Sequence, residues 1–450
     1  MTDTPTESTK VDTSKTTRRI TPAVEAGIAV VALAALVGGI GLAGAQSVPE
    51  PETAPLQATL GRVCPALPET PGKLFVMADG AGGVINGPVG GTTTRHAATS
   101  FELEGVTVPY TLRTDEHGGV VSAGLHVGGE AQQRWGSCLP TSAQSHLLMQ
   151  SGKGTTLQLI NPYGIEALVN VSLNGPDGEI TADNLRDLRV GPGEVETIDL
   201  EPLVGENTPL GVRVQSSAGR VLAVAAQGNA DTAEFVAPGA LARELVLPAV
   251  PPQAQSATLA LMNPATTRTR VKVEVLGSTG RFVPDGGAEI SVEAGRTTRM
   301  DLTPALREEG VSVIITADAP VTATVITRTE KDAAYSPAQP LRTGDDAVLA
   351  APIAAAGNLI LSNPSEVEVE ATIDWGEGIT RGVNQVPAGA SIVVQTPEGA
   401  RHVEVMADGL LVGGLIIGNS NEAGIAIAPL LDFAAARATT PIRVQPKLGS

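Results

Sequence analysis

Hydrophobic and polar residues alternate along this chain in a pattern that recurs three times, at intervals of about 100 residues. Each copy opens with Leu-x-Leu-x-Asn-Pro, and the three Asn-Pro pairs are Asn161-Pro162, Asn263-Pro264 and Asn363-Pro364. Seven residues after each proline a second alternating run begins, such as Val169, Val171 and Leu173. Since alternate residues of a strand share one face, each run predicts a strand with one buried face.

Each copy continues with turn signals and a closing hairpin. A Val-x-x-Gly turn follows the second run, at 190–193, 292–295 and 386–389. About six or seven short strands within a copy of this length are typical of a β-sandwich domain. We therefore predict an all-β chain of tandem Ig-like β-sandwich repeats. The alternative is a β-propeller, to which each copy contributes about two four-stranded blades.

The Asn-Pro pairs have a structural interpretation. Proline lacks an amide hydrogen and ends a strand, while the residue before it is held extended and asparagine can bond its own backbone. The competing interpretation is a ligand-binding asparagine at each domain edge. Because the pair follows a strand in all three copies, we expect it to be a strand-end motif.

A fourth, degenerate copy precedes the other three. In it, Leu74-Phe-Val76 stands where the Leu-x-Leu of the other copies stands. Four β-domains, called the extended domains below, follow from this alignment. Their expected bounds are 61–143, 144–244, 245–347 and 348–450.

The N-terminal part differs from the repeats because residues 26–45 contain no charged residue. Twenty helical residues span about 30 Å, the thickness of a membrane's hydrocarbon core. Lys15, Arg18 and Arg19 precede the segment, so the positive-inside rule places the N-terminus in the cytoplasm. This predicts a cytoplasmic tail at 1–25 and a single-pass plasma-membrane anchor at 26–45. Extracytoplasmic domains are then expected after a Pro-rich linker at 46–60. The alternative is secretion after cleavage of a signal peptide near Ala45.

The chain has two cysteines, Cys64 and Cys138, both in the first extended domain. An exported pair most simply forms one disulfide, so we predict a stapled domain. The alternatives are a metal-binding pair or a nucleophile.

Charge and motif searches do not indicate an enzyme. The net charge is −18, which argues against nucleic acid as a partner. Three of the five histidines fall in 61–143 and a fourth, His146, follows directly, but none belongs to a metal-binding His-Glu-x-x-His motif. The sequence also lacks a Gly-x-Ser-x-Gly elbow and a Walker loop. We therefore expect no catalytic residue, no cofactor and no metal site.

The anchor, the Pro-rich linker and the repeats together resemble a family of uncharacterised, membrane-anchored, exported actinobacterial envelope proteins. The markers are Cys64-Pro65, Trp135-Gly-Ser-Cys138 and the Asn-Pro pairs, and the resemblance covers roughly residues 20–450. It implies an extracytoplasmic setting in the cell envelope and supplies no catalytic residue. We expect a non-enzymatic scaffold or interaction protein whose partner is an envelope protein or glycan. The alternative is an enzyme or enzyme accessory in envelope glycan assembly.

The partner-specific surface is expected in the first extended domain, which differs most from its neighbours. Loops at the ends of sandwiches commonly carry function. The segments least like the repeat are 78–91, 115–119 and 184–189.

Overall fold

The computed structural model of the chain describes residues 61–432 except 68–69, 79–82, 99, 115–120, 129–131, 229–233, 253, 307–308, 331, 342–346, 377 and 419–423. Within the compact unit Gln57–Thr439, these residues form antiparallel strands and three short 3₁₀ helices. The described residues hold no α-helix, so the all-β prediction is confirmed for them. They accordingly include no helix that could cross a membrane. The expected tail, anchor and linker (1–60) lie outside the described residues.

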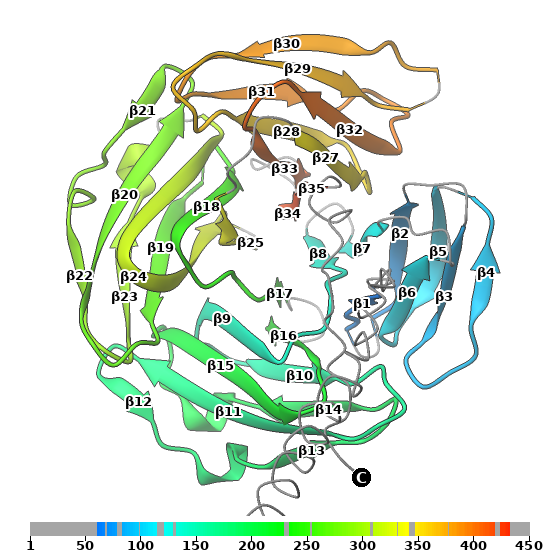
Figure 1. Cartoon of the computed structure of the whole chain (residues 1–450), viewed down its shortest axis with the longest axis vertical. Helices are drawn as coiled ribbons and strands as arrows, with labels where there is room; N and C mark the ends of the chain where they lie inside the picture. The colour runs from blue at the N-terminus through cyan, green and yellow to red at the C-terminus, as the bar shows by residue number, and fades with distance from the viewer. Residues whose placement is uncertain are drawn as a thin grey trace, which may run out of the picture. The chain divides into compact units, whose positions relative to one another are not determined.

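Each of the four repeats consists of two antiparallel sheets (Figure 1). In the first repeat one sheet has the order β1 (Arg62–Cys64), β6 (Tyr110–Thr114), β3 (Val84–Pro88), β4 (Thr94–His96). The other has the order β5 (Ser100–Val106), β2 (Gly72–Ala78), β7 (Val121–Gly128), β8 (Gln133–Ser137).

The second repeat follows the same plan. Its first sheet has the order β12 (Gly178–Ile180), β11 (Ala167–Gly175), β15 (Pro209–Ala218), β9 (Gln144–Gln150), and β13 (Leu188–Val190) also pairs with β11. Its second sheet has the order β14 (Val195–Asp199), β10 (Thr156–Ile160), β16 (Leu222–Gln227), β17 (Glu234–Val236). The 3₁₀ helices η1 (Asp183–Leu185) and η2 (Glu201–Leu203) lie in its connections.

In the third repeat one long strand, β24 (Val311–Arg328), serves both sheets. Its first half pairs with β20 (Thr269–Gly277) and β18 (Ala242–Val250), which extend to β21 (Gly280–Phe282), β22 (Ile290–Val292) and β26 (Gln339–Pro340). Its second half lies between β19 (Ser256–Asn263), paired with β23 (Arg296–Asp301), and β25 (Ala333–Pro337). The 3₁₀ helix η3 (Thr303–Ala305) follows β23.

The fourth repeat closes the described chain. One sheet has the order β30 (Gly382–Val386), β29 (Val369–Asp374), β32 (His402–Ala407), β27 (Ala347–Pro352), β35 (Leu431–Asp432). The other has the order β31 (Ser391–Gln395), β28 (Gly357–Ser362), β33 (Val412–Ile417), β34 (Ala426–Pro429).

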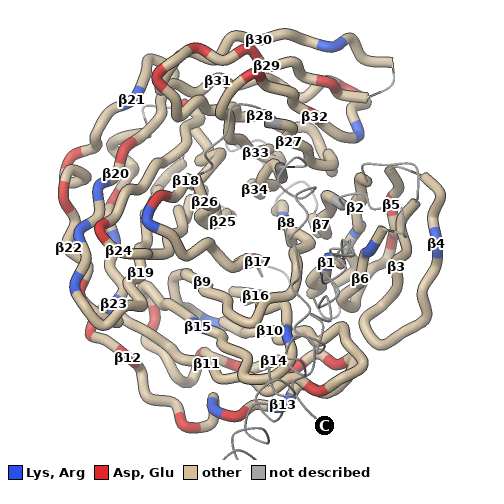
Figure 2. The backbone as a smooth tube through the Cα atoms, in the orientation of Figure 1, with Lys and Arg blue, Asp and Glu red and all other residues tan. Residues whose placement is uncertain are grey.

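The two sheets of a repeat face each other across an apolar core built from the alternating runs. In the second repeat Leu157, Leu159, Val169, Val171 and Leu173 are at most 4% exposed and belong to one cluster. The polar residues between them on β11, Asn170 and Ser172, are partly exposed. Charged residues lie mainly on outer strands and turns (Figure 2).

The outer faces of the sheets are apolar as well, and they join the repeats into a closed ring. The core cluster of the first repeat includes Phe235 of the second, and the core cluster of the second repeat includes Tyr335 of the third. A further cluster joins residues of the third repeat to Ile360 of the fourth. The ring closes because Phe75 and Trp135 of the first repeat belong to the core of the fourth. Each repeat thus packs on the next, and the fourth packs on the first.

The Val-x-x-Gly turns found in the sequence form the rim of these junctions. Gly193, Gly295 and Gly389 have φ values of 67°, 65° and 66°. Each meets the preceding repeat: Gly193 faces Gly90, the Asn174 side chain donates to the carbonyl of Gly295, and Gly389 lies against Arg281. A Cβ on Gly193 would lie 2.7 Å from the Gly90 Cα, so glycine is needed there for close approach as well as for its positive φ.

The three Asn-Pro asparagines are fully buried and make the same contacts. Nδ2 of Asn263 donates to the carbonyls of Thr267 (2.8 Å) and Val292 (3.0 Å), and its Oδ1 accepts the amide of Ala265. Equivalent bonds surround Asn161 and Asn363. Each asparagine therefore ties the end of one strand to the Val-x-x-Gly turn that meets the neighbouring repeat.

Cys64 and Cys138 form a disulfide, as predicted. Both are fully buried in the core of the first repeat. Closing a loop of this size contributes up to about 4 kcal/mol in the chain-entropy model.

Replacing Asn263 with alanine should destabilise the protein by about 2–4 kcal/mol, since several buried backbone groups lose their partners. Thermal and urea unfolding of the full chain measure this loss. The control is Asn184→Ala, at an exposed position, which should unfold like the wild type. Equal stability of the two variants would contradict the structural role of the motif.

Candidate functional site

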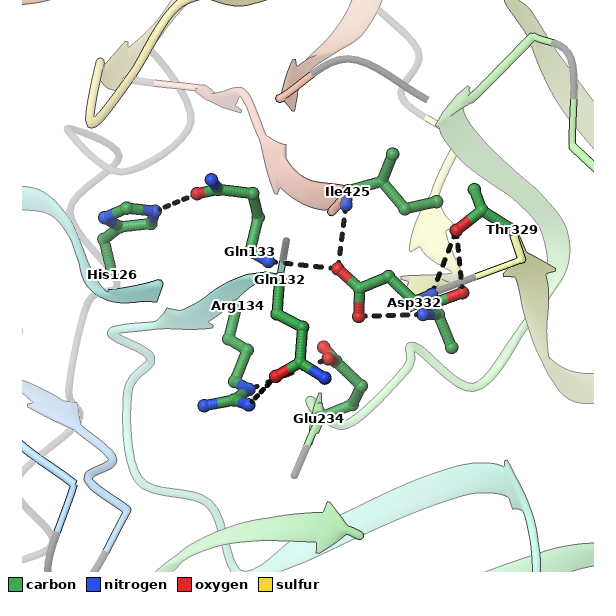
Figure 3. Close-up of polar contacts among 9 residues, drawn as sticks. His126, Gln132, Gln133, Arg134, Glu234, Thr329, Asp332 and Ile425 are labelled. Carbon is green, nitrogen blue, oxygen red and sulfur yellow. Dashed lines mark hydrogen bonds and ion pairs between the residues drawn. The ribbon is translucent and has the colours of Figure 1, made fainter. Parts of the chain in front are cut away.

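The innermost strands of the four repeats, β8, β17, β25 and β34, lie against one another around the centre of the ring. Each follows the closing hairpin of its repeat, so the fold brings four equivalent strand beginnings together. Buried and half-buried polar side chains gather there (Figure 3).

Asp332 is the centre of this cluster. Its Oδ2 accepts the backbone amides of Gln133 (3.0 Å) in the first repeat and Ile425 (2.9 Å) in the fourth. The Thr329 hydroxyl accepts the Asp332 amide (3.0 Å), and the Thr329 amide donates to the Asp332 carbonyl (2.8 Å). This local turn fixes the carboxylate, which therefore joins three of the four repeats.

Glu234 supplies the second repeat's contribution. The residue is 8% exposed, and the nearby Asp332 acts on its carboxyl group. Burial raises the pKa of Glu234 well above its usual value, and the charge and hydrogen bond of Asp332 raise it further, whereas Arg134 lowers it. The raised pKa favours the protonated form of the Glu234 carboxyl group, which is the form that can donate a hydrogen bond.

Arg134 lies beside the pair and forms a long ion pair with Glu234. Its Nε is 3.9 Å from Oε1 of Glu234, and its Nη2 donates to Oε1 of Gln132 (2.5 Å). His126 Nε2 contacts Oε1 of the neighbouring Gln133 at 2.6 Å. Burial lowers the pKa of His126, so this imidazole is neutral at neutral pH.

A polar cavity of about 320 Å³ adjoins the cluster. Three repeats line it, with the side chains of Gln132, Lys153, Gln227, Glu234, Arg328, Thr329, Glu330, Asp332 and Tyr335. Tyr335 donates to Oε1 of Gln227, and burial raises the pKa of this tyrosine above its usual value. The arrangement places two carboxyl groups and amide groups at one cavity wall, where they can bind hydroxyl or amine groups.

The residues singled out from the sequence lie elsewhere. The cysteines and the three Asn-Pro pairs do not line this cavity in the described part of the chain. Of the segments expected to bind a partner, 115–119 and residues 79–82 of 78–91 lie outside the described residues, and 184–189 contains part of η1 and β13. Among the described residues, no three His, Cys, Asp or Glu side chains form a group that could hold a metal.

Glu234 and Asp332 were missed because they stand alone in the sequence, almost 100 residues apart. The signal that was present is positional: Arg134, Glu234 and Asp332 each lie at or next to the start of the short strand that follows the closing hairpin of their repeat. A charge at that place in three copies indicates a shared centre once the ring is known.

Comparison with known proteins gives a family and no activity. Residues 135–397, more than half of the chain, match the model of a family of unknown function (DUF5719). No curated protein sequence matches the chain. An α-L-rhamnosidase from Streptomyces avermitilis, solved with L-rhamnose, aligns with 76% of this chain at 9% identity and a TM-score of 0.13. The alignment spans 54% of that enzyme and carries no structural argument.

The raised pKa of Glu234 predicts a specific dependence of stability on pH. The protonated group's contribution is complete below the unfolded-state pKa near 4.5 and declines as the pH rises toward the higher folded-state pKa. The wild type should therefore lose stability relative to Glu234→Gln above about pH 4.5, by up to about 1.4 kcal/mol per pH unit.

Melting temperatures of both proteins between pH 4 and pH 8 test this dependence. Glu196→Gln, at an exposed position, is the control and should track the wild type. A constant difference between wild type and Glu234→Gln across the range would mean that Glu234 is ionised in the folded protein.

Proposed function

The chain belongs to a family of unknown function (DUF5719), and we propose from its own geometry that it is a non-enzymatic interaction protein. One observation carries the proposal: four repeats form a closed ring whose centre holds a polar cavity lined by three of them. Because close-packed apolar side chains cover both faces of the sheets, such a ring is expected to be rigid. A rigid platform with convergent polar groups is suited to holding a partner without chemistry.

For the finer architecture, two features support different parts of the prediction. Two sheets that share a core within each repeat support the assignment of Ig-like sandwiches. Sheets that pack face to face around a ring support the propeller alternative for the arrangement of the repeats. We propose sandwich repeats joined in a propeller-like ring.

The proposed location is the outer face of the plasma membrane. The support is the uncharged segment 26–45 with its basic flank, and the disulfide, which suits an exported domain. The proposed partner is a protein or glycan of the cell envelope. The first repeat, with the loops that differ most from the other copies, is proposed as a part of the contact surface.

Site-specific photo-crosslinking in the native cells tests the interaction role. Lys153 and Glu330 line the central cavity and are exposed, so a crosslinker can replace either without disturbing the core. Both positions should give an adduct of the same mass, and the exposed control position Glu196 should give none. Absence of an adduct at both positions, or the same adduct at all three, would contradict the central cavity as the binding surface.

The second candidate function is an enzyme or enzyme accessory acting on envelope glycan. The observation that favours it is a pair of carboxyl groups at the wall of a polar cavity, those of Asp332 and of Glu234, and burial raises the pKa of Glu234. Glycosidases use two carboxyl groups of this kind, one protonated and one ionised.

Incubation of the purified chain with isolated cell-wall polysaccharide tests this candidate through the release of reducing ends. An enzyme should lose about 10²–10⁴-fold in rate on Glu234→Gln or Asp332→Asn, which is the usual contribution of a positioned acid or base. Glu196→Gln should keep the full rate. A wild type that releases nothing removes the enzymatic candidate.

A further inference from the structure

A second and larger cavity, of about 560 Å³, lies at the junction of the first and second repeats, apart from the central cluster. Residues of β1 and β6, the turn after β3 and two turns of the second repeat line it. The cavity is part of the rim built by the Asn-Pro and Val-x-x-Gly motifs. It shares no lining residue with the central cavity.

Asn161 and two glycines hold the walls of this cavity in place. Nδ2 of Asn161 donates to the carbonyls of Val190 and Gly191, both at 3.0 Å. The Gly193 amide donates to the Tyr163 carbonyl (3.1 Å), and the backbones of Gly193 and Gly90 are in contact. These bonds fix two turns of the second repeat against one turn of the first.

Arg62 on β1 is the unusual residue of this cavity. The side chain is only 9% exposed, although it carries a charge and lines the cavity. Its Nη1 donates to the Cys138 carbonyl (3.3 Å), and its Nε has no hydrogen-bond partner among the described residues. Burial lowers the pKa of Arg62 to about 10, which still leaves the guanidinium charged at neutral pH. A buried cation without a carboxylate beside it is costly, and an anionic ligand would remove that cost.

The rest of the lining favours an anion as well. Arg113 supplies a second guanidinium, and Thr93, Thr111 and Thr141 supply hydroxyl groups. No Asp or Glu is among the described residues that line the cavity, although the chain as a whole carries a net charge of −18. Guanidinium groups bind carboxylates and phosphates through paired hydrogen bonds.

Tyr163 adds an aromatic ring to the rim. Its side chain is 44% exposed, and its hydroxyl is 2.6 Å from that of Thr141. The same position after Asn-Pro holds Ala265 in the third repeat and Ser365 in the fourth. An exposed aromatic ring beside polar groups suits the apolar C–H face of a sugar ring, and among the exposed large hydrophobic side chains of the described residues Tyr163 is the one aromatic.

The corresponding junctions are closed by bonds within the protein. Between the second and third repeats, Asn174 Nδ2 donates to the Gly295 carbonyl at 2.8 Å. Between the third and fourth, Arg281 donates to the Pro364 carbonyl and lies 3.8 Å from a carboxylate oxygen of Glu366. The cation at that junction thus has a partner, whereas Arg62 has none among the described acids.

We propose that the junction of the first and second repeats binds an oxyanion carried on a sugar-sized molecule, with Arg62 as its buried charge partner and Tyr163 as the platform for the ring. The oxyanion is a carboxylate, as in a uronic acid, or a phosphate, as in a sugar phosphate. This site stands independently of the function proposed for the central cavity.

Glucuronate, glucose 1-phosphate and glucose are the probes, and calorimetry and melting temperature of the full chain are the readouts. The two anions should bind and raise the melting temperature, whereas neutral glucose should do neither. The anion that binds more tightly shows whether the site prefers a carboxylate or a phosphate. Binding of glucose as tight as that of both anions, or no response to either anion, would overturn the proposal.

Arg62→Met and Tyr163→Ala locate the binding. Arg62→Met should weaken both anions at least about tenfold, the scale of a lost charge-assisted hydrogen bond. Without ligand it should be no less stable than the wild type, because the unpaired buried charge is gone; a merely structural arginine would give a lower melting temperature. Tyr163→Ala should weaken both anions and leave the disulfide intact.

Two further variants keep the test decisive. Arg113→Met, at an exposed position, should also weaken both anions and does not depend on a buried substitution. The matched control is Arg243→Met, exposed in the third repeat, which should bind like the wild type. Unchanged affinity in Arg113→Met and Tyr163→Ala together would place any binding elsewhere and overturn the site.

Discussion

Burial of both faces of each sheet is the constraint on which the rest of the structure depends. A sheet whose inner face meets its partner within a repeat would still expose its outer face if the repeats were separate. The outer faces carry residues such as Leu148, Val246 and Ile360, which are all at most 1% exposed. The contacts between neighbouring repeats around the ring remove these side chains from water. The hydrophobic effect therefore stabilises the ring of repeats as well as the core of each repeat.

Much of the fold could be predicted from the sequence because its signals are local. The alternation on β11 and the turn glycines 193, 295 and 389 each act within a few residues, and they give the strands and the turns. The ring left a weaker signal in the inner strands, where apolar residues run without alternation, as in Leu147-Leu148-Met149. Such a run is typical of a strand buried on both faces, yet it is too short by itself to identify what covers the second face.

The central cluster could not be predicted for a physical reason. Its members come from four repeats, and the contacts between Gln133, Asp332 and Ile425 exist only once the ring is closed. Spacing along the chain carries no information about such a site. The same holds for Arg62, whose isolation from carboxylates depends on which residues surround it in space. By contrast, the disulfide followed from counting and compartment alone, since two cysteines allow one pairing.

Ring closure also has a consequence for biogenesis. The contacts between first and last repeats join residues more than 200 positions apart, such as Ser122 and Ala350, whose hydroxyl and carbonyl are 3.3 Å apart. During synthesis the first repeat leaves the ribosome long before the surface that covers Phe75 and Trp135 exists. A chain that stops early presents these aromatic side chains to solvent, where chaperones and proteases recognise them. The burial of Phe75 and Trp135 thus depends on synthesis of the fourth repeat.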